Sequence, residues 1–265
     1  MNRRHFLLTT AGALAAWSLN KLWAGEARGE FLAHILPAAG ADRDIAARGA
    51  LLAAEEAARA AELLGRRLEL RVGGPGDASK LIDQGALALI GGFDAPERAA
   101  LSELAEARGI PLLTTRAAAD SSDDEPLRTH IFHVALGPGG RRAALERWRA
   151  RESAAVGKAE INEWHPSLKR FGAEQLNQRY HERFGLGMEP LAWASWMAVK
   201  AAAEAALRGA KTPADLSRRL ATLGFDGHKG MRLRFRPSDH TLRQTLYVVA
   251  GGKVLAEIPP EEEQE

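Results

Sequence analysis

The chain has 265 residues, and its hydrophobic content of 46% supports a packed core and excludes an intrinsically disordered protein. Its 36 basic and 34 acidic residues leave a net charge of +2, which is too small to indicate a nucleic-acid-binding protein. The sequence contains no cysteine, so disulfides, thiol chemistry and a lipid-anchored cysteine are all excluded.

The N-terminus has the pattern of an export signal. Arg3 and Arg4 precede an apolar run of about fourteen residues, FLLTTAGALAAWSL, which is too short to span a bilayer comfortably. The twin arginine favours the twin-arginine export route, and an ordinary secretory signal is the alternative. We therefore expect residues 1–27 to be a signal peptide, cleaved after Ala24 or Ala27, and the mature protein to be soluble in the periplasm, without a membrane span.

Strand and helix patterns alternate along the first half of the mature chain. Short apolar or alternating runs predict strands, and runs with helical spacing lie between them. The predicted strands are residues 31–36, 66–74, 86–92, 110–115 and 130–136, and the helices between them are residues 45–65, 77–85 and 94–109. This order predicts a parallel sheet with helices on both faces, which is the three-layer α/β/α fold class.

Capping signals mark the starts of two of these helices. Asp42 or Asp44 is placed to cap the helix that follows the first strand. Asp94 and Glu97, three residues apart, form the capping box of the helix that follows the third strand. Gly109 is the expected end of that helix.

The second half of the chain is mainly helical until strands close it. A basic helix is predicted at residues 141–152, but residues 152–165 are polar and have no clear period. Further helices are predicted at residues 165–185, 189–209 and 212–224, and strands at residues 225–235 and 241–258. We expect residues 28–265 to form a single α/β domain with extra C-terminal helices and a β-hairpin.

The order of elements resembles the type I periplasmic binding proteins, the substrate-binding proteins of branched-chain amino acid ABC transporters. Three later stretches, WHPSLKRFGAEQLNQRYHERFG, AWASWMAVKAAAEAAL and FDGHKGMRLRFRPSDHTLRQTLYVV, resemble the branch associated with alcohol oxidation that depends on pyrroloquinoline quinone (PQQ). The resemblance implies a binding protein without a cofactor. Its implied partners are a small organic ligand, an ABC permease, and a quinoprotein dehydrogenase or a cytochrome.

The resemblance also implies that the chain is shortened. Members of the family hold their ligand between two α/β lobes, and several units of the second lobe would stand where residues 152–165 are. We expect a linker there in place of most of lobe two, with the hinge lost; an ordinary long surface loop is the alternative.

A two-lobed receptor gains affinity by closing over its ligand and excluding water. We therefore interpret the chain as a reduced receptor that acts by partner contact or by weak ligand binding. The alternatives are a working solute receptor, with its site rebuilt on one lobe or across a homodimer, and an uncharacterised enzyme.

Candidate ligand-binding residues follow two of the predicted strands, because ligands of parallel sheets bind at the carboxyl ends of the strands. The resemblance implies that the loop GGFDAPE, which contains Asp94 and Ala95, contacts a ligand carboxylate. The carboxylate of Asp94 would repel such a ligand, so we expect no amino-acid binding. Thr114, Thr115 and Arg116 could hold an anion, although a threonine pair at a strand end also simply reflects β-propensity.

Candidate partner-binding residues lie on the basic helix RRAALERWRARE. Arg142, Trp148 and Arg149 combine positive charge with an aromatic ring, as docking surfaces often do. Loss of the second lobe would also expose surface that once faced the cleft. The alternative interpretation is an ordinary solvated helix face.

No catalytic, metal or cofactor site is predicted. The glycine-rich loop GGPGDAS lacks a Walker lysine and a full dinucleotide motif, so it is interpreted as a turn. His130 and His133 lie three apart on a predicted strand and so point to opposite faces. Four side chains near two predicted turns could bind a cation only if the turns converge: Asp226, His228, Asp239 and His240.

Overall fold

The structure, a computed structural model of the chain, describes residues 30–116, 128–152 and 158–260. The predicted signal peptide lies outside these residues, and so does the acidic loop after Arg116. Within the described ranges, no helix is long and apolar enough to cross a membrane.

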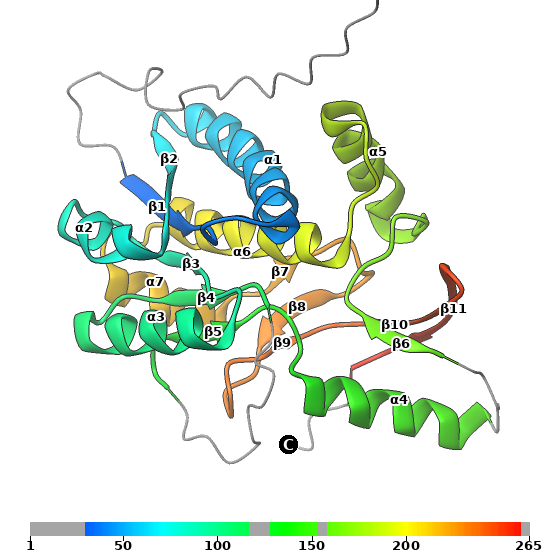
Figure 1. Cartoon of the computed structure of the whole chain (residues 1–265). Helices are drawn as coiled ribbons and strands as arrows, with labels where there is room; N and C mark the ends of the chain where they lie inside the picture. Colours follow the sequence, from blue (N-terminus) through cyan, green and yellow to red (C-terminus); the bar gives the residue numbers. More distant parts are fainter. Residues whose placement is uncertain (1–29, 117–127, 153–157, 261–265) are drawn as a thin grey trace, which may run out of the picture.

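Five parallel strands form the main sheet, in the order β2-β1-β3-β4-β5 (Figure 1). They are β1 (Glu30–Ile35), β2 (Leu68–Gly73), β3 (Leu89–Gly91), β4 (Leu112–Thr114) and β5 (Ile131–His133). The apolar side chains of β1, β3, β4 and β5 are buried on both faces, as expected of a parallel sheet covered by helices, whereas Val72 on the edge strand β2 is exposed. The predicted α/β fold with a parallel sheet is therefore confirmed.

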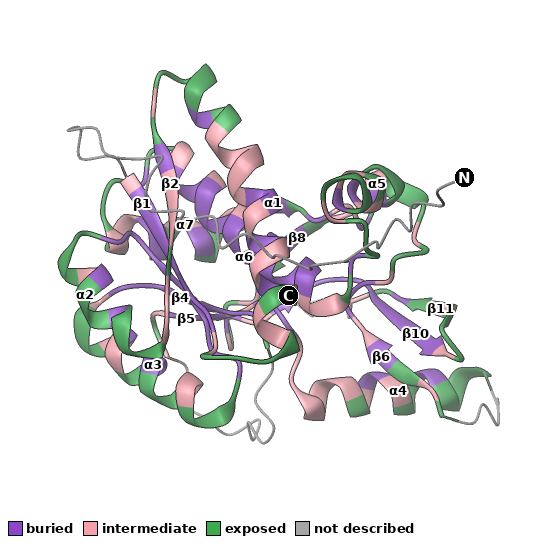
Figure 2. Ribbon diagram, turned by 45° about the horizontal axis from the view of Figure 1, so that its top comes forward, coloured by how far each residue is buried: buried purple, intermediate pink, exposed green. Residues whose placement is uncertain are grey.

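Helices cover both faces of this sheet (Figures 1 and 2). On one face lie η2 (Pro75–Asp77), α2 (Ala78–Asp83) and α3 (Ala95–Arg108). The other face packs against α1 (Ala41–Leu63), α6 (Pro190–Leu207) and α7 (Pro213–Thr222), with α5 (Ala173–Phe184) beside them. Helix α6 is apolar nearly all round, which is why it is the most buried helix of the larger core.

Helices α1 and α6 approach each other closely at Gly49. A Cβ atom at this position would overlap the carbonyl group of Ala192, so glycine is required for the helix crossing. This contact holds the larger core together, because α1 and α6 bury most of its alanine and tryptophan side chains against one another.

A smaller antiparallel sheet lies beside the main one, in the order β11-β10-β6 (Figure 1). Its strands are β6 (Glu160–Asn162), β10 (Leu246–Ala250) and β11 (Lys253–Ile258). Helix α4 (Pro138–Glu152) packs on one face and encloses a second core, formed by Ala144, Trp148, Ile161, Leu246, Val248 and Ile258. The register of β10 with β11 shifts after Val248, which makes Leu255 the extra residue of a bulge on β11.

A third, short antiparallel sheet extends the main sheet beyond β5. Its strands are β7 (Phe225–Asp226), β8 (Arg232–Phe235) and β9 (Leu242–Arg243). His133 at the end of β5 forms a parallel bridge with Thr241, so this sheet follows directly on from the main one.

The structure departs from the sequence-based prediction at three places. Strand β6 lies inside the polar segment 152–165 that was predicted as a linker. The N-cap of helix α1 is Gly40, which makes no side-chain cap, so neither Asp42 nor Asp44 is the N-cap; both lie in the first turn of the helix. The helix predicted at residues 165–185 is shorter, because positive φ angles at Phe171 and Gly172 separate η3 (Arg170–Gly172) from α5.

Replacement of Gly49 by alanine tests the helix crossing. Because the added methyl group would overlap the backbone of Ala192, we expect the free energy of unfolding to fall by about 3 kcal/mol or more. Gly139→Ala, in the first turn of α4, is the matched control, since its added methyl group meets nothing within 4 Å. Urea denaturation measures both variants, and equal stability of the two would contradict the proposed crossing.

Candidate functional site

The predicted ligand loops meet at the carboxyl edge of the main sheet. Strands β1, β3 and β4 are adjacent in the sheet, so the loops that follow them lie side by side. Arg116, which follows β4, forms an ion pair with Asp42 in the first turn of α1. The loops after β1 and β4 are therefore in direct contact at this edge.

The two helix starts after β2 and β3 already carry their own carboxylates. Asp94 accepts a hydrogen bond from the backbone N–H of Glu97 at 2.8 Å, and Glu97 accepts one from Phe93 at 3.2 Å. The predicted N-cap at Asp94 is confirmed, but the return bond of the predicted capping box goes to the N–H of Phe93 and not to that of Asp94. Asp77 likewise accepts from the N–H of Gly74 at 2.8 Å. These carboxylates occupy N–H groups that an anionic ligand would otherwise use, and their charge repels it.

The remaining predicted ligand residues have different environments. Ala95 is exposed beside Asp94, and Arg116 is exposed at the edge. Thr114 is buried, and its hydroxyl lies 3.0 Å from Nδ1 of His133. Thr115 is also buried, and its hydroxyl has no hydrogen-bond partner among the described residues. Of the threonine–arginine group, only Arg116 reaches solvent.

His34 is a residue of this edge that the sequence analysis did not single out. It lies on β1 next to Ile90 of β3, is fully buried, and has no hydrogen-bond partner at either ring nitrogen within the described part of the chain. Burial, and secondarily the positive charge of Arg43, lowers the pKa of His34 to about 3. The available signal was a single histidine within the otherwise apolar strand FLAHIL.

The buried His34 makes the stability of the protein depend on pH. The unfolded chain takes up a proton at His34 below pH 6.5, whereas the folded chain does so only near pH 3, so stability is lost as the pH falls through this range. Between pH 7 and pH 5 the loss from this group is about 2 kcal/mol.

We expect His34→Leu to remove this component of the pH dependence. Urea denaturation of the wild type and the variant at pH 7, 6 and 5 measures the difference between their stabilities. The difference should shift in favour of the variant as the pH falls. A constant difference would show that His34 is protonated equally easily in the folded and unfolded chains.

A buried polar network ties the main sheet to the smaller one. The chain passes between the two sheets three times, after β5, after β6 and after β9. The ammonium group of Lys229 donates to the carbonyl oxygen of Glu163, to Oε1 of Gln244 at 2.6 Å and to the carbonyl oxygen of Thr245 at 2.8 Å. Gln244 in turn donates to the carbonyl of Val134 at 2.8 Å. Lys229 thus links all three passages, and the expected loss of the hinge stays a prediction.

Glu163 is the acidic centre of the same network. Its carboxylate accepts two hydrogen bonds from Arg141 of α4, at 2.8 and 2.9 Å, and one from the N–H of Leu136 at 2.9 Å. Burial lowers the pKa of Lys229 well below its usual value, and the charge of Glu163 opposes this shift. Three acceptors around Nζ and the ring of Trp193 at 4.0 Å favour the charged ammonium form.

Lys229→Met tests the network. The variant keeps most of the apolar stem but leaves the three acceptors without their donor, so we expect a loss of about 3 kcal/mol or more in stability. Amide hydrogen exchange should also rise in β10 and β11. Lys200→Met is the control, because Lys200 pairs with Glu204 and lies near the ring of Trp196, but its side chain stays 24% exposed to solvent. Its cost should stay below about 1 kcal/mol, and an equal cost for the two variants would contradict a special role for Lys229.

The candidate partner-binding residues of α4 separate into two groups. Arg142 and Arg149 are exposed on the outer side of the helix. Trp148 is only 8% exposed and belongs to the second core, under the smaller sheet. Its ring is therefore unavailable to a partner, which corrects the expectation that it shares a docking surface with the two arginines.

The candidate metal ligands are engaged locally. His130 lies 3.2 Å from the hydroxyl of Ser217, and Asp226 accepts from the N–H of His228. Asp239 pairs with Arg236, and the ring of His240 stacks on Phe132. The described residues hold no group of three or more side chains suited to a metal ion.

Comparisons with known proteins identify the fold. No protein-family model and no curated protein matches the sequence. Among solved structures, an ABC transporter substrate-binding protein from Sphaerobacter thermophilus matches with a TM-score of 0.70 at 13% identity, over 88% of this chain and 98% of that one. The chain has the fold of the type I periplasmic binding proteins.

Two further neighbours are a leucine-binding protein and an ABC transporter substrate-binding protein that was solved in complex with Leu. One, from Thermotoga maritima, has a TM-score of 0.70 at 15% identity and covers 87% of this chain and 99% of its own. The other, from Desulfitobacterium hafniense in complex with Leu, has a TM-score of 0.69 at 15% identity and covers 87% and 100%. These neighbours are binding proteins, not enzymes. At such low identity the likeness shows the fold alone.

Proposed function

We propose that the chain is an exported, periplasmic homologue of ABC transporter substrate-binding proteins that is reduced as a receptor. It acts by contact with a partner protein or by weak binding of a small organic ligand, within a system of PQQ-dependent alcohol oxidation. The link to alcohol oxidation and the export both rest on the resemblance of the sequence.

This proposal rests mainly on one observation: at the carboxyl edge of the main sheet, carboxylates of the chain already occupy the N-termini of η2 and α3. Asp77 and Asp94 already accept hydrogen bonds from the N–H groups of their own loops. The carboxylate of a free amino acid would have to displace them and approach two negative charges. Strong binding of leucine, the amino acid with which one of the neighbours was solved, is therefore not expected here.

The smaller sheet supports the proposal that the second lobe is reduced. Three strands and one covering helix enclose a core of six buried residues, whereas the main sheet has five strands with helices on both faces. Lys229 and Glu163 fix the passages between the two sheets. Because these passages are fixed, the smaller sheet is poorly suited to the hinge closure by which two-lobed receptors trap a ligand.

A working solute receptor is the second candidate function, because one observation favours it. His34 and Thr115 place buried polar atoms without hydrogen-bond partners at the carboxyl edge, within the part of the chain that the structure describes. Buried polar groups are usually satisfied by protein, water or ligand. A neutral molecule with hydroxyl or amide groups would satisfy them without meeting the repulsion that an amino acid meets.

A ligand screen by thermal shift separates the two functions. The panel comprises leucine, isoleucine, and small alcohols, aldehydes, acids and quinones. We expect no stabilisation by the amino acids and at most a small shift with the others. A ligand present at a hundred times its Kd would add about 2.7 kcal/mol of stability, so a strong hit with an amino acid, alcohol, aldehyde or quinone would favour the receptor and overturn the reduced role.

A second experiment measures partner binding, with purified quinoprotein alcohol dehydrogenase and cytochrome immobilised on a sensor. We expect binding that weakens about tenfold or more when Arg142 and Arg149 of α4 are both replaced by glutamate. Arg59→Glu with Arg208→Glu is the control, because these arginines are equally exposed on other helices. If the chain binds neither protein and the ligand screen gives a strong hit, the proposed role as a reduced receptor is contradicted.

A further inference from the structure

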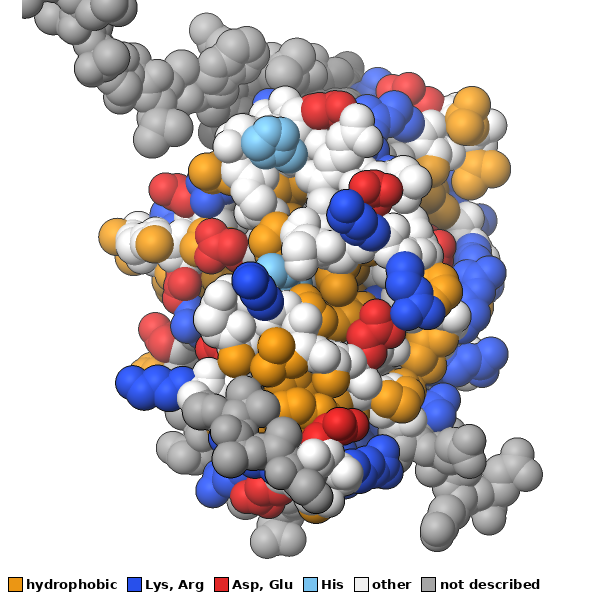
Figure 3. Space-filling model, turned by 90° about the vertical axis from the view of Figure 1, so that its right-hand side faces the viewer, with side chains coloured by type: hydrophobic (Ala, Val, Ile, Leu, Met, Phe, Trp, Pro, Cys, Tyr) orange, Lys and Arg blue, Asp and Glu red, His pale blue; other side chains and the backbone are white. Residues whose placement is uncertain are grey.

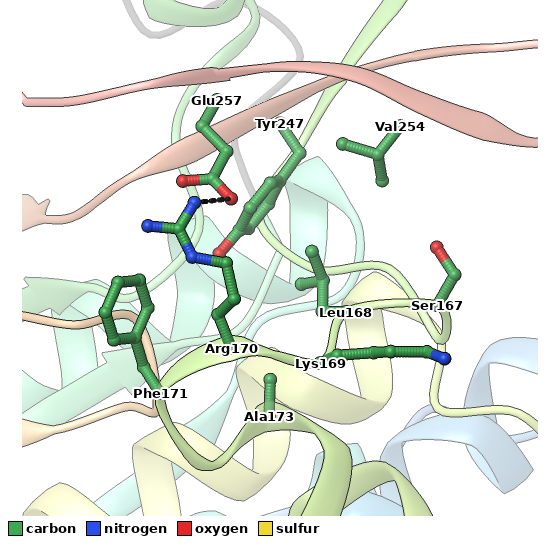
Figure 4. A pocket seen from close by; sticks show the side chains of 9 residues that line it. All are labelled: Ser167, Leu168, Lys169, Arg170, Phe171, Ala173, Tyr247, Val254 and Glu257. Carbon is green, nitrogen blue, oxygen red and sulfur yellow. Dashed lines mark ion pairs between the residues drawn. The ribbon is translucent and has the colours of Figure 1, made fainter.

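A pocket of about 190 Å³ lies away from the carboxyl edge, between the smaller sheet and the turn that leads into α5. Its wall on one side is formed by β10 and β11, and its floor by residues 167–173 (Figure 4). On the molecular surface it belongs to the face that carries α5, β11 and the end of α4, where apolar side chains gather in the lower half of Figure 3.

The hydroxyl of Tyr247 points into this pocket (Figure 4). Tyr247 is only 4% exposed, yet no described residue is hydrogen-bonded to its hydroxyl. Burial, and secondarily the charge of Glu257, raises the pKa of Tyr247, so its hydroxyl stays protonated and able to donate. The ammonium of Lys229 lies 5.3 Å from the centre of the Tyr247 ring.

Arg170 brings a second set of donors to the same place. Its side chain is 71% exposed, and its guanidinium lies 3.7 Å from Glu257, outside hydrogen-bond distance, and 4.7 Å from the ring of Phe171. These are its partners within the described residues, so its N–H groups are available to a ligand. Figure 4 shows the guanidinium between Glu257 and the hydroxyl of Tyr247.

The rest of the lining sets the charge and the shape of a ligand. Lys169 adds a second positive charge, so the pocket has two cations against the single carboxylate of Glu257. Leu168, Val254 and Phe171 supply apolar surface. Phe171 holds a left-handed φ of 58° and is 52% exposed, so strained backbone keeps a large apolar side chain at the rim.

We propose that this pocket binds a small aliphatic carboxylate. The guanidinium of Arg170 and the hydroxyl of Tyr247 donate hydrogen bonds to the carboxylate, and the aliphatic group packs against Leu168 and Val254. Glu257 then loses its loose pairing with Arg170 and turns to solvent, where it is already 40% exposed. The volume is below the ~300–1,000 Å³ of sites for drug-sized ligands, which restricts the site to small acids or to the terminal residue of a peptide.

Isothermal titration calorimetry with isovalerate and its neutral isostere isovaleramide tests the site in the full mature chain. We expect isovalerate to bind at least tenfold more tightly than the amide, because only the carboxylate pairs with Arg170. N-acetyl-glycyl-leucine and its C-terminal amide form the second pair of probes. Tighter binding of isovalerate assigns the site to free acids, and tighter binding of the dipeptide acid assigns it to chain termini.

Four variants connect the binding to the residues. Arg170→Gln should weaken isovalerate binding at least tenfold, and Tyr247→Phe about threefold to tenfold. Glu257→Gln should strengthen it, since a competing carboxylate is removed. Arg183→Gln is the matched control, because Arg183 is also exposed, pairs with a glutamate and stacks on the neighbouring phenylalanine.

Two results would overturn the proposal. One is binding of neither acid in preference to its amide, and the other is an equal effect of Arg170→Gln and Arg183→Gln. Arg116→Gln, at the carboxyl edge of the main sheet, should leave isovalerate binding unchanged. The outcome is thereby independent of the proposed function at that edge.

Discussion

The arrangement of the two sheets depends on one buried ammonium group. Lys229 holds backbone and side-chain oxygens from two passages between the sheets, and through Gln244 it reaches the third. Burial of a lysine costs free energy, because its ammonium group loses contact with water. Several hydrogen-bond acceptors and a nearby carboxylate are needed to compensate for this loss. Glu163 supplies that carboxylate and is itself held by Arg141 of α4. This network positions the small sheet and its helix α4, and with them the pocket that Tyr247 lines.

The features that the sequence predicted are those fixed by local chemistry. The N-cap at Asp94 and the glycine end at Gly109 were predicted because each involves residues within one or two turns of each other. The burial of α6 was predicted because its apolar residues leave no polar face. The α/β class followed from the alternation of strand and helix patterns, in which each element carries its own periodic signal.

The features that were missed depend on contacts between distant parts of the chain. Strand β6 reads Glu-Ile-Asn and has no strand pattern of its own; it exists because β10, more than eighty residues later, pairs with it. Trp148 looked available on a basic helix, and only the packing of that helix on the same sheet buries it. In the candidate ligand site, the negative charge of the Asp94 loop could be predicted from the sequence. The ion pair of Arg116 with Asp42 and the lack of hydrogen-bond partners at His34 among the described residues could not.

The bulge at Leu255 has a consequence for how the molecule behaves in a crowded compartment. Strand β11 is an edge strand within the described residues, and a flat, regular edge readily recruits strands from other molecules. The extra residue breaks the regular spacing of the outward N–H and C=O groups, and Pro259 and Pro260 follow immediately. The small sheet can thus keep an unpaired edge strand that does not readily pair with strands of other molecules.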